Sequence, residues 1–285
     1  MDFKNNEFIL QNYTVNNKSL NFNKPLVMAI VNITKNSFYD GNKYGSVIDV
    51  LKDIELKIEQ GADVIDVGAA STKSGEELIK PETEWEILSQ NIKTIRKTFP
   101  NIILSVDTYN SQTAQLAVNE GVDIINDISG GNFDKKMFET VAKNNIVYVI
   151  MHIKGTPNNM QLNPNYKNVI DEVYTVLEDK ITHLKKLNFN KIIIDPGFGF
   201  GKSVDDNFKL LKNLIRFKNL GYPILAGLSR KSMINNVINT NPATALNGTT
   251  ALNTMALLNG AKILRVHDVI EAKQTIQLFN KYQSV

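Results

Sequence analysis

The chain has 285 residues, of which 42% are apolar and 21% are charged, and its formal net charge is +3. These proportions are those of an ordinary globular protein and exclude a disordered or fibrous chain. Because the net charge is small and the basic residues are spread along the chain, nothing predicts nucleic acid as a partner. The chain has no cysteine, which excludes disulfides, thiolate metal sites and cysteine nucleophiles.

Residues 1–24 are expected to form an N-terminal extension, as a short hairpin or an arm. The first twenty residues lack the apolar centre of a signal peptide. The longest apolar runs, such as Ile146–Met151, are far shorter than the roughly 20 residues that cross a bilayer as a helix. We therefore expect a cytoplasmic protein without membrane contact.

Eight short apolar runs rich in β-branched residues follow the extension. They are Leu26–Val31, Val64–Val67, Ile102–Val106, Val122–Ile125, Ile146–Met151, Lys191–Ile194, Ile224–Ala226 and Lys262–Val266. Near-continuous apolar runs of this length are typical of parallel strands that are buried on both faces.

The stretches between these runs carry apolar residues at helical spacing, for example at residues 50–58 and again at 208–215. Thr83 and Glu86 have the spacing of a capping box at the start of a helix. Eight strands that each precede a helix predict one α/β domain over residues 25–285, a (β/α)8 TIM barrel. An open doubly wound sheet is the alternative.

Polar residues follow all eight predicted strands. In chain order they are Asn32, Ser71 and Thr72, Asp107, Asn126 and Asp127, His152, Asp195, Ser229 to Ser232, and Arg265 with His267. One such residue would indicate only a turn or a helix cap. Since the active sites of TIM barrels lie at the carboxyl ends of the strands, the repetition predicts a ring of polar side chains around one mouth.

The ring divides into two chemical groups. One offers the acceptors and donors that suit the edge of a flat heterocycle: Asp107, Asn126, Asp195 and Lys231. The other offers donors that suit phosphate oxygens: Asn32, Thr72, Arg265 and His267. Together they predict a ligand that carries both a heterocycle and a diphosphate.

Some polar residues near the ring have structural interpretations. Asp66 lies inside an apolar run and is interpreted as a buried support beneath the ring. His152 either orients its neighbours or is a satisfied core histidine, and Arg230 is expected to point away as an ion-pair partner. The glycines of the Gly197–Gly201 run resemble a phosphate-binding run, but the strand and acidic residue of a dinucleotide site do not accompany them, so nucleotide binding is rejected there.

Several stretches resemble the dihydropteroate synthases, and together they extend from about Leu26 to Ala272. The matching stretches are Ala29–Thr34 with Ser37–Gly41, Ser105–Tyr109, Ile124–Gly131, Met151–Pro157 with Met160–Gln161, Asp195–Lys202, Ser229–Ser232, Asn247–Thr250 and Arg265–Val269. Each stretch alone is weak support, but all of them occur in order and at the spacing of a barrel.

The resemblance implies a transferase that condenses 6-hydroxymethyl-7,8-dihydropterin pyrophosphate with p-aminobenzoate, giving 7,8-dihydropteroate and pyrophosphate in folate biosynthesis. It implies pterin contacts at Asp107, Asn126, Met151, Asp195, Gly227 and Lys231. It implies diphosphate contacts at Asn32, Thr72, Arg265 and His267, with Mg²⁺ bridging the phosphate oxygens and Asn32 as its ligand. The implied p-aminobenzoate contacts are Phe38, Lys231 and Ser232.

The same resemblance implies that Asp107, Lys231 and Asp40 take part in catalysis. It implies that the Gly197–Gly201 run forms a tight turn that lets the ligand ring approach the backbone. It also implies a homodimer, for which Leu246–Leu258 is a candidate surface. Two other interpretations stay open. A methyltetrahydrofolate corrinoid methyltransferase shares the barrel but has no diphosphate to bind. A non-catalytic pterin-binding paralogue would keep the fold while its loops drift.

Two loops depart from the family pattern. The first reads Thr-Lys-Asn-Ser at residues 34–37, where the family usually has Thr-Pro-Asp-Ser. The second reads Ser-Thr-Lys-Ser-Gly at residues 71–75, where the family usually has Ser-Thr-Arg-Pro-Gly. The loss of two prolines should loosen both loops. Because these loops build the p-aminobenzoate pocket of the family, we hypothesise altered sulfonamide binding.

Overall fold

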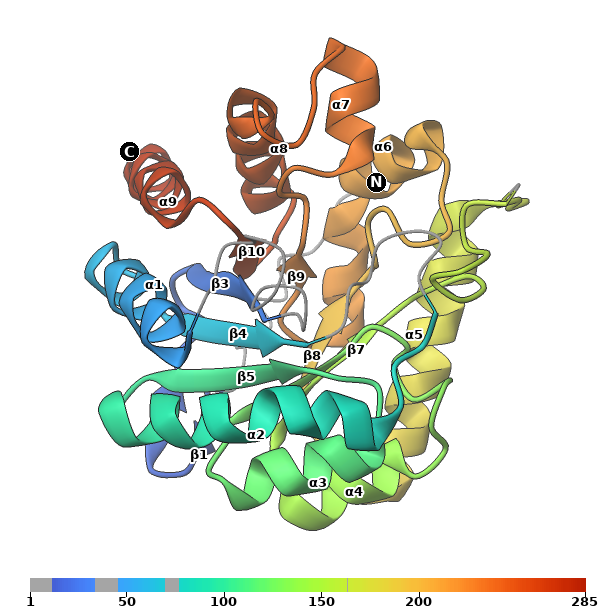
Figure 1. Ribbon diagram of the computed structural model, residues 1–285. Coiled ribbons are helices and arrows are strands. Elements are labelled where there is room, and N and C mark those ends of the chain that lie inside the picture. Colours follow the sequence, from blue (N-terminus) through green and yellow to red (C-terminus); the bar gives the residue numbers. More distant parts are fainter. Residues whose placement is uncertain (1–11, 34–45, 70–76, 163) are drawn as a thin grey trace.

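A computed structural model describes residues 12–33, 46–69, 77–162 and 164–285. Within them, eight parallel strands form one sheet in the order β8-β7-β6-β5-β4-β3-β10-β9, with helices around its outer face (Figure 1). The two edges meet at a parallel bridge between Ile194 and Ile224. The amide of Ile194 also donates to the carbonyl of Pro223 at 2.9 Å. The sheet is a nearly closed barrel, so the predicted (β/α)8 fold is confirmed.

All eight predicted strands are present, with their ends shifted by one or two residues. The barrel strands are β3 (Leu26–Asn32), β4 (Val64–Gly68), β5 (Ile103–Asp107), β6 (Ile124–Asp127), β7 (Val147–Met151), β8 (Ile192–Asp195), β9 (Leu225–Ala226) and β10 (Ile263–Val266). The α-helices are α1 (Val47–Glu59), α2 (Pro81–Thr98), α3 (Ser111–Asn119), α4 (Met137–Asn144), α5 (Val169–Lys186), α6 (Val204–Lys212), α7 (Ser232–Ile238), α8 (Leu246–Leu258) and α9 (Val269–Gln283). A 3₁₀ helix, η2 (Leu214–Leu220), follows α6.

The burial of the strands explains why their sequences are nearly continuous apolar runs. Every residue of β4 to β8 is buried, because each strand faces the barrel interior on one side and helices on the other. The helices turn one apolar stripe inward, as α1 does with Val50 and Ile54. Among the described residues, no helix combines the length and the apolar composition that a membrane crossing requires.

Two local predictions were wrong. Helix α2 begins at Pro81, after Lys80 as its N-cap, because the fixed φ of proline suits the first helical position. Thr83 therefore lies inside the helix and does not cap it. Residues 208–215 do not form one helix, since α6 ends at Lys212 and Asn213 separates it from η2. The side-chain amide of Asn213 donates to the carbonyl of Lys209 at 2.8 Å, in the way that asparagine competes with helix continuation.

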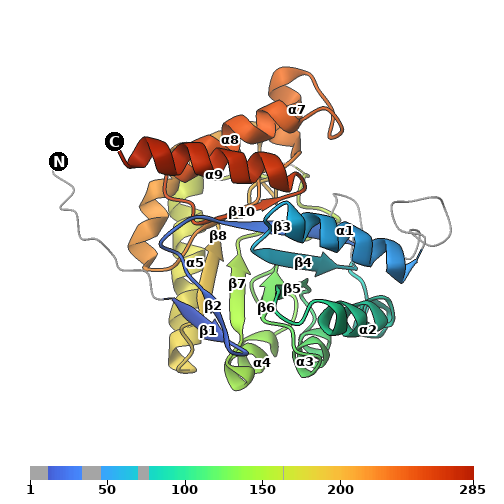
Figure 2. The same ribbon diagram turned by 90° about the vertical axis from the view of Figure 1, so that its left-hand side faces the viewer.

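A small antiparallel hairpin, β1 (Tyr13–Val15) and β2 (Lys18–Leu20), precedes the barrel. Asn16 and Asn17 form its turn with φ of 47° and 60°, the left-handed region that a two-residue hairpin turn favours. Figure 2 shows the hairpin beside the ends at which β6 and β7 begin. It therefore covers the amino end of the barrel and leaves the carboxyl ends of the strands to the ring.

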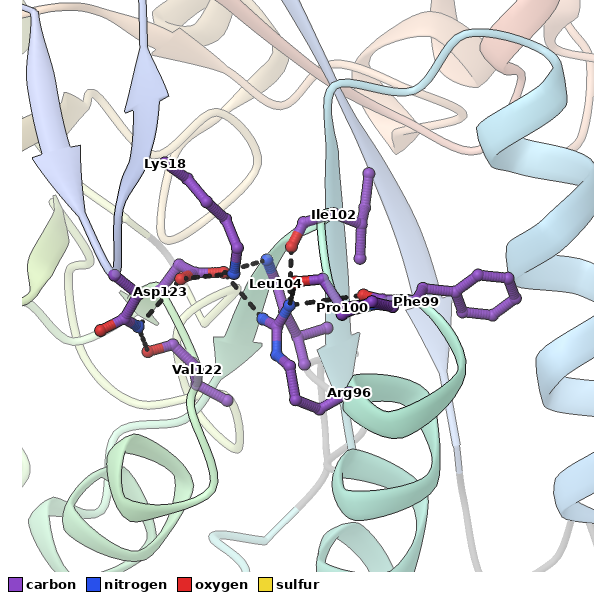
Figure 3. Close-up of polar contacts among 9 residues, drawn as sticks. Lys18, Arg96, Phe99, Pro100, Ile102, Leu104, Val122 and Asp123 are labelled. Atoms are coloured by element: carbon purple, nitrogen blue, oxygen red, sulfur yellow. Dashed lines mark hydrogen bonds and ion pairs between the residues drawn. The ribbon is translucent and has the colours of Figure 1, made fainter.

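The hairpin is attached to the barrel through Asp123, the fully buried residue that directly precedes β6 in the chain (Figure 3). The carboxylate of Asp123 accepts from Lys18 Nζ at 2.9 Å and from Arg96 Nη2 at 2.7 Å. It also accepts from Asn16 Nδ2 at 2.9 Å and from the amide of Leu104 at 2.9 Å. Four donors from the hairpin, α2 and β5 thus compensate one buried charge.

Candidate active site

The register of the sheet places three predicted ring residues in one row. Asn32 of β3 pairs with Gly68 of β4, Gly68 pairs with Asp107 of β5, and Asp107 pairs with Asn126 of β6. A Cβ atom at Gly68 would lie 3.2 Å from Asp107 Cβ and 3.7 Å from Asn32 Oδ1. The absence of a side chain at Gly68 therefore leaves space between the two polar groups at the carboxyl end of the barrel.

Arg265 lies on β10, the strand beside β3, and its guanidinium is bound by two carboxylates. Its Nε donates to Asp66 Oδ2 at 2.7 Å, and its Nη2 donates to Asp107 Oδ2 at 2.7 Å. Asp66 is fully buried and also accepts from Asn126 Nδ2 at 3.1 Å. Asp66 therefore holds two ring residues from below, in agreement with its interpretation as a buried support.

The electrostatics of this group follow from burial. Burial raises the pKa of Asp107 to about 7, although the positive charge of Arg265 opposes the shift. Burial acts to lower the pKa of Arg265, but the charges of Asp66 and Asp107 outweigh it, so that the pKa rises. Arg265 is thus a permanent cation, whereas Asp107 can change its charge near neutral pH.

Asp195 and Lys231 form the second wall of the ring. Asp195 ends β8, and one of its carboxylate oxygens accepts from the amide of Gly197 at 2.7 Å. Burial raises the pKa of Asp195, and the nearby ammonium of Lys231 opposes that shift. Burial lowers the pKa of Lys231 to about 8, while Asp195 raises it. The charges of the two side chains therefore act on each other within the ring.

Lys231 is positioned by the loop between β8 and α6, residues 196–203, which we call the β8–α6 loop. The Nζ of Lys231 donates to the carbonyl of Phe198 and lies 4.6 Å from the ring centroid of Phe200. A Cβ atom at Gly199 would lie 3.1 Å from Lys231 Cδ, and the φ of Gly199 is +82°. This glycine therefore allows both the turn and the close approach of the lysine, as the interpretation of the glycine run as a tight turn expects.

The two apolar positions that the resemblance assigns to the pterin also border the ring. A Cβ atom at Gly227 would lie 3.8 Å from Lys231 Nζ and 4.0 Å from Arg265 Cβ, so this glycine lies between the two cations. Met151 pairs in register with Asp195 and belongs to a small buried cluster with Tyr109 and Phe200. The ring thus has apolar as well as polar surfaces.

His267 lies two residues after Arg265 and beside Ser229, with 3.0 Å between His267 Nδ1 and Ser229 Oγ. The side chain of His267 is exposed, yet desolvation by nearby protein atoms lowers its pKa to about 4, and the charges of Arg265 and Arg230 act in the same direction. At neutral pH it therefore offers an N–H donor and no charge. Arg230 itself pairs with Asp268 at 2.5 Å, as its predicted role away from the site requires.

Of the remaining predicted residues, the structure describes Ser232 only. Ser232 is the exposed first residue of α7, directly after Lys231. Phe38, Asp40 and Thr72 lie outside the described residues, as do the loop departures at 35, 36, 73 and 74. The ring in the described part of the chain therefore consists of the pterin group and three of the four diphosphate residues.

The sequence patterns did not indicate two buried ionic residues that support the site, Glu84 and Lys202. Glu84 of α2 accepts from Thr108 Oγ1 at 2.7 Å and from Asn110 Nδ2 at 2.9 Å, so it holds the segment after Asp107. Its place four residues before Leu88, on the inward stripe of α2, was a usable signal. Lys202, in the β8–α6 loop, contacts His152 Nδ1 at 2.9 Å. His152 is accordingly a satisfied core histidine.

The described residues offer few metal ligands. No group of three or more histidine and acidic side chains among them could hold a metal ion. Asn32 provides an amide oxygen at the mouth, a hard ligand of the type that Mg²⁺ accepts. Because Mg²⁺ often keeps few protein ligands and takes phosphate oxygens instead, the donor set fits an ion that is bound together with a diphosphate.

Comparisons with known proteins cover the whole ring. The family model described as "Pterin binding enzyme" matches residues 28–267. The chain is 37% identical to the dihydropteroate synthase of Haemophilus influenzae over 266 residues, which are 93% of this chain and 96% of that protein. It is 36% identical to the dihydropteroate synthase of Escherichia coli over 91% of this chain and 92% of that protein.

Two solved structures show the same similarity in three dimensions. Yersinia pestis dihydropteroate synthase, in complex with a sulfonamide drug, has a TM-score of 0.91 at 30% identity, over 96% of this chain and 100% of that one. The Xanthomonas albilineans enzyme in complex with 7,8-dihydropteroate has a TM-score of 0.86 at 32% identity, over 96% and 100%.

Proposed function

The chain belongs to the dihydropteroate synthases of the pterin binding enzyme family, and from that premise we propose how its residues carry out the reaction. A dihydropteroate synthase is a transferase that joins 6-hydroxymethyl-7,8-dihydropterin pyrophosphate to p-aminobenzoate and releases pyrophosphate. The observation that carries the proposal is the row of Asn32, Asp107 and Asn126 together with Arg265, which donates to Asp107. It joins groups suited to a heterocycle and to a diphosphate at one barrel mouth.

In the proposed complex, the pterin lies between the two walls of the ring. The carboxylate of Asp195 accepts from adjacent N–H groups on the aminopyrimidinone edge, and Asn126 supplements it with its amide. Lys231 donates to the other side of the ring system. Met151 and Gly227 provide the apolar surface and the free space that a flat ring needs.

The diphosphate is proposed to bind at Arg265 and His267, together with Asn32 and Thr72. Arg265 keeps its charge at all working pH values because two carboxylates raise its pKa, so it can stabilise the anion that leaves. Mg²⁺, bound by phosphate oxygens and Asn32, would neutralise further charge. Asp107 lies beside Arg265 and stabilises positive charge that develops on the pterin as pyrophosphate departs.

The p-aminobenzoate is proposed to enter between Lys231, the exposed Ser232 and Phe38, with Asp40 near the reacting groups. Its amine attacks the cationic pterin methylene, so the enzyme needs no covalent intermediate. Because the Yersinia pestis relative binds a sulfonamide drug, we propose that sulfonamides also bind this chain, with affinity altered by the loop departures. Side-by-side inhibition of this enzyme and the Escherichia coli enzyme tests that proposal; equal inhibition constants would contradict it.

A homodimer is proposed on the surface of α8. None of the thirteen residues of α8 is charged, and Met255 and Leu258 are 46% and 50% exposed. The end of α7 adds Val237 and Ile238, which are also exposed. An uncharged apolar face of this kind suits a self-complementary interface between two copies. The expectations of a cytoplasmic location and of no nucleic-acid partner stay predictions.

The reaction itself is the test of the proposed function. Purified protein is mixed with the pterin pyrophosphate, p-aminobenzoate and Mg²⁺, and dihydropteroate and pyrophosphate are measured. Formation of both products in equal amounts is expected. Pterin binding without product would favour the non-catalytic paralogue, and binding of methyltetrahydrofolate with no such turnover would favour the corrinoid methyltransferase.

A further inference from the structure

Lys202 is a buried lysine that the reaction described above does not use. Its residue is only 3% exposed, yet its Nζ lies among four acceptors. The carbonyl oxygens of Gly197, Phe200 and His152 lie at 2.7, 3.0 and 3.3 Å, and His152 Nδ1 lies at 2.9 Å. Burial lowers the pKa of Lys202 well below its ordinary value, and the charge of Asp195 opposes that shift. The hydrogen bonds of its N–H groups, and not a fixed charge, therefore stabilise the backbone that surrounds it.

The acceptors belong to two segments that Lys202 joins. Gly197 and Phe200 are in the β8–α6 loop, whereas His152 directly follows β7. The two segments touch, because a Cβ atom at Gly197 would lie 1.9 Å from the carbonyl oxygen of His152. The loop thus turns its carbonyl groups inward, where water is scarce, and an ammonium group with three N–H donors can bind them together.

The imidazole of His152 completes this arrangement as an acceptor. Burial lowers the pKa of His152 to about 2, and the charge of Lys202 acts in the same direction. The ring is therefore neutral, and its Nδ1 can accept from Lys202 while the proton resides on Nε2. His152 is thus an acceptor for Lys202 and does not compete with it as a second cation.

The same loop positions the second wall of the ring. The amide of Gly197 donates to the carboxylate of Asp195. The carbonyl of Phe198 accepts from Lys231, and the ring of Phe200 lies beneath the Lys231 ammonium. Any movement of the loop would therefore change the geometry of both Asp195 and Lys231.

We propose that Lys202 is a positioning residue for the pterin site, whose ammonium group fixes the β8–α6 loop so that Asp195 and Lys231 face the pterin. The inference rests on the proposed function of that site. A rise in KM confined to the pterin substrate, together with rescue by Lys202→Arg, is a result that a purely structural residue would not give.

The test compares Lys202→Met with the wild-type enzyme under steady-state conditions. Methionine keeps the approximate length of the side chain but removes the Nζ donor from three backbone carbonyls, of which, among the described residues, only that of Gly197 retains another donor, the amide of Phe200. We expect the KM for the pterin pyrophosphate to rise at least about tenfold, with a smaller change in the KM for p-aminobenzoate.

Lys18→Met is the matched control, because Lys18 is a partly buried lysine at the opposite end of the barrel. It should lower thermal stability and leave both KM values unchanged. Lys202→Arg, which restores a cation with several donors, should recover part of the pterin affinity. If Lys202→Met does not fold, Lys202→Gln keeps two N–H donors without the charge and is measured instead.

The outcomes separate this inference from the function on which it rests. Wild-type turnover together with a folded Lys202→Met enzyme of unchanged KM for the pterin pyrophosphate would overturn the positioning role alone. Absence of wild-type turnover would overturn the proposed function instead. In that case, calorimetric titration with 6-hydroxymethylpterin still decides the inference, since Lys202→Met should bind the pterin at least about tenfold more weakly.

Discussion

Arg265 and Asp66 are separated by 199 positions in the chain, yet 2.7 Å separates Nε of the arginine from Oδ2 of the aspartate. This bond orients the guanidinium so that its Nη2 can reach Asp107. The other oxygen of Asp66, Oδ1, has no hydrogen-bond partner among the described residues. Arg265 is therefore held in place by the buried carboxylate of Asp66, which supports the site without contacting a ligand.

Asp66→Asn should destabilise the protein and weaken catalysis together. The substitution removes one of the two carboxylates that pair with Arg265, so the loss should stay below the roughly 3–5 kcal/mol of a fully uncompensated buried charge, because Asp107 still pairs with the arginine. Urea denaturation should show that loss, and kcat/KM should fall because Arg265 is less well oriented. Ser105→Ala is the control, since Ser105 pairs with Asp66 in register and its buried Oγ has no partner in the described part of the chain. An equal loss in both variants would contradict the role of the ion pair.

The charge of Asp107 should make stability depend on pH in a defined direction. Burial raises its folded-state pKa to about 7, so the folded protein retains a proton that the unfolded chain loses near pH 4. The contribution of Asp107 to the free energy of unfolding is therefore highest below about pH 4 and falls as pH rises to about 7. The stability difference between wild type and Asp107→Asn should fall by a few kcal/mol over that range.

Asp134→Asn provides a control of opposite sign for the same urea titrations. Hydrogen bonds from Ser111 and Lys136 lower the pKa of Asp134 against its partial burial. Its contribution is present above the unfolded pKa and is lost as pH falls. A difference for Asp107→Asn that grows with rising pH, as for Asp134→Asn, would mean that Arg265 outweighs burial at Asp107.

The hairpin anchor predicts a loss of stability without a loss of function. Asp123→Asn leaves Lys18 and Arg96 without their carboxylate at the amino end of the barrel (Figure 3). We expect a stability loss of about 3–5 kcal/mol, measured by urea denaturation, with unchanged kcat and KM in the folded protein. Lys18→Met should cost less because Arg96 still compensates the charge. A raised KM in a fully folded Asp123→Asn enzyme would contradict this separation of the two ends.

The proposed dimer can be disrupted by charge. Met255→Lys combined with Leu258→Lys places two cations on the uncharged face of α8, and like charges would then face each other across a two-fold axis. Light scattering should report a dimer for the wild type and a monomer for the double variant. Leu278→Lys is the control, because Leu278 is 74% exposed on α9 and lies outside the proposed surface. A monomeric wild type would contradict the proposed dimer.

The sequence predicted the fold and most of the ring for the same physical reason. Parallel strands that are buried on both faces have apolar sequences. A polar residue at the end of such a run, such as Asp107 or Asp195, therefore indicates a candidate site residue. Glu84 and Lys202 escaped notice because charged residues in helices and loops are usually exposed. Their burial depends on backbone carbonyls and hydroxyls that only the tertiary fold brings together. The start of α2 was misjudged because Pro81 gave a better helix start than Thr83.

The central claim is that one mouth binds a heterocycle on one side and a diphosphate on the other. Calorimetric titration with the two halves of the substrate, 6-hydroxymethylpterin and Mg²⁺-pyrophosphate, tests it most directly. Asp195→Asn should weaken pterin binding at least about tenfold and leave pyrophosphate affinity nearly unchanged, whereas His267→Ala should do the reverse. If each substitution weakens both ligands equally, or neither ligand, the two-part site is wrong.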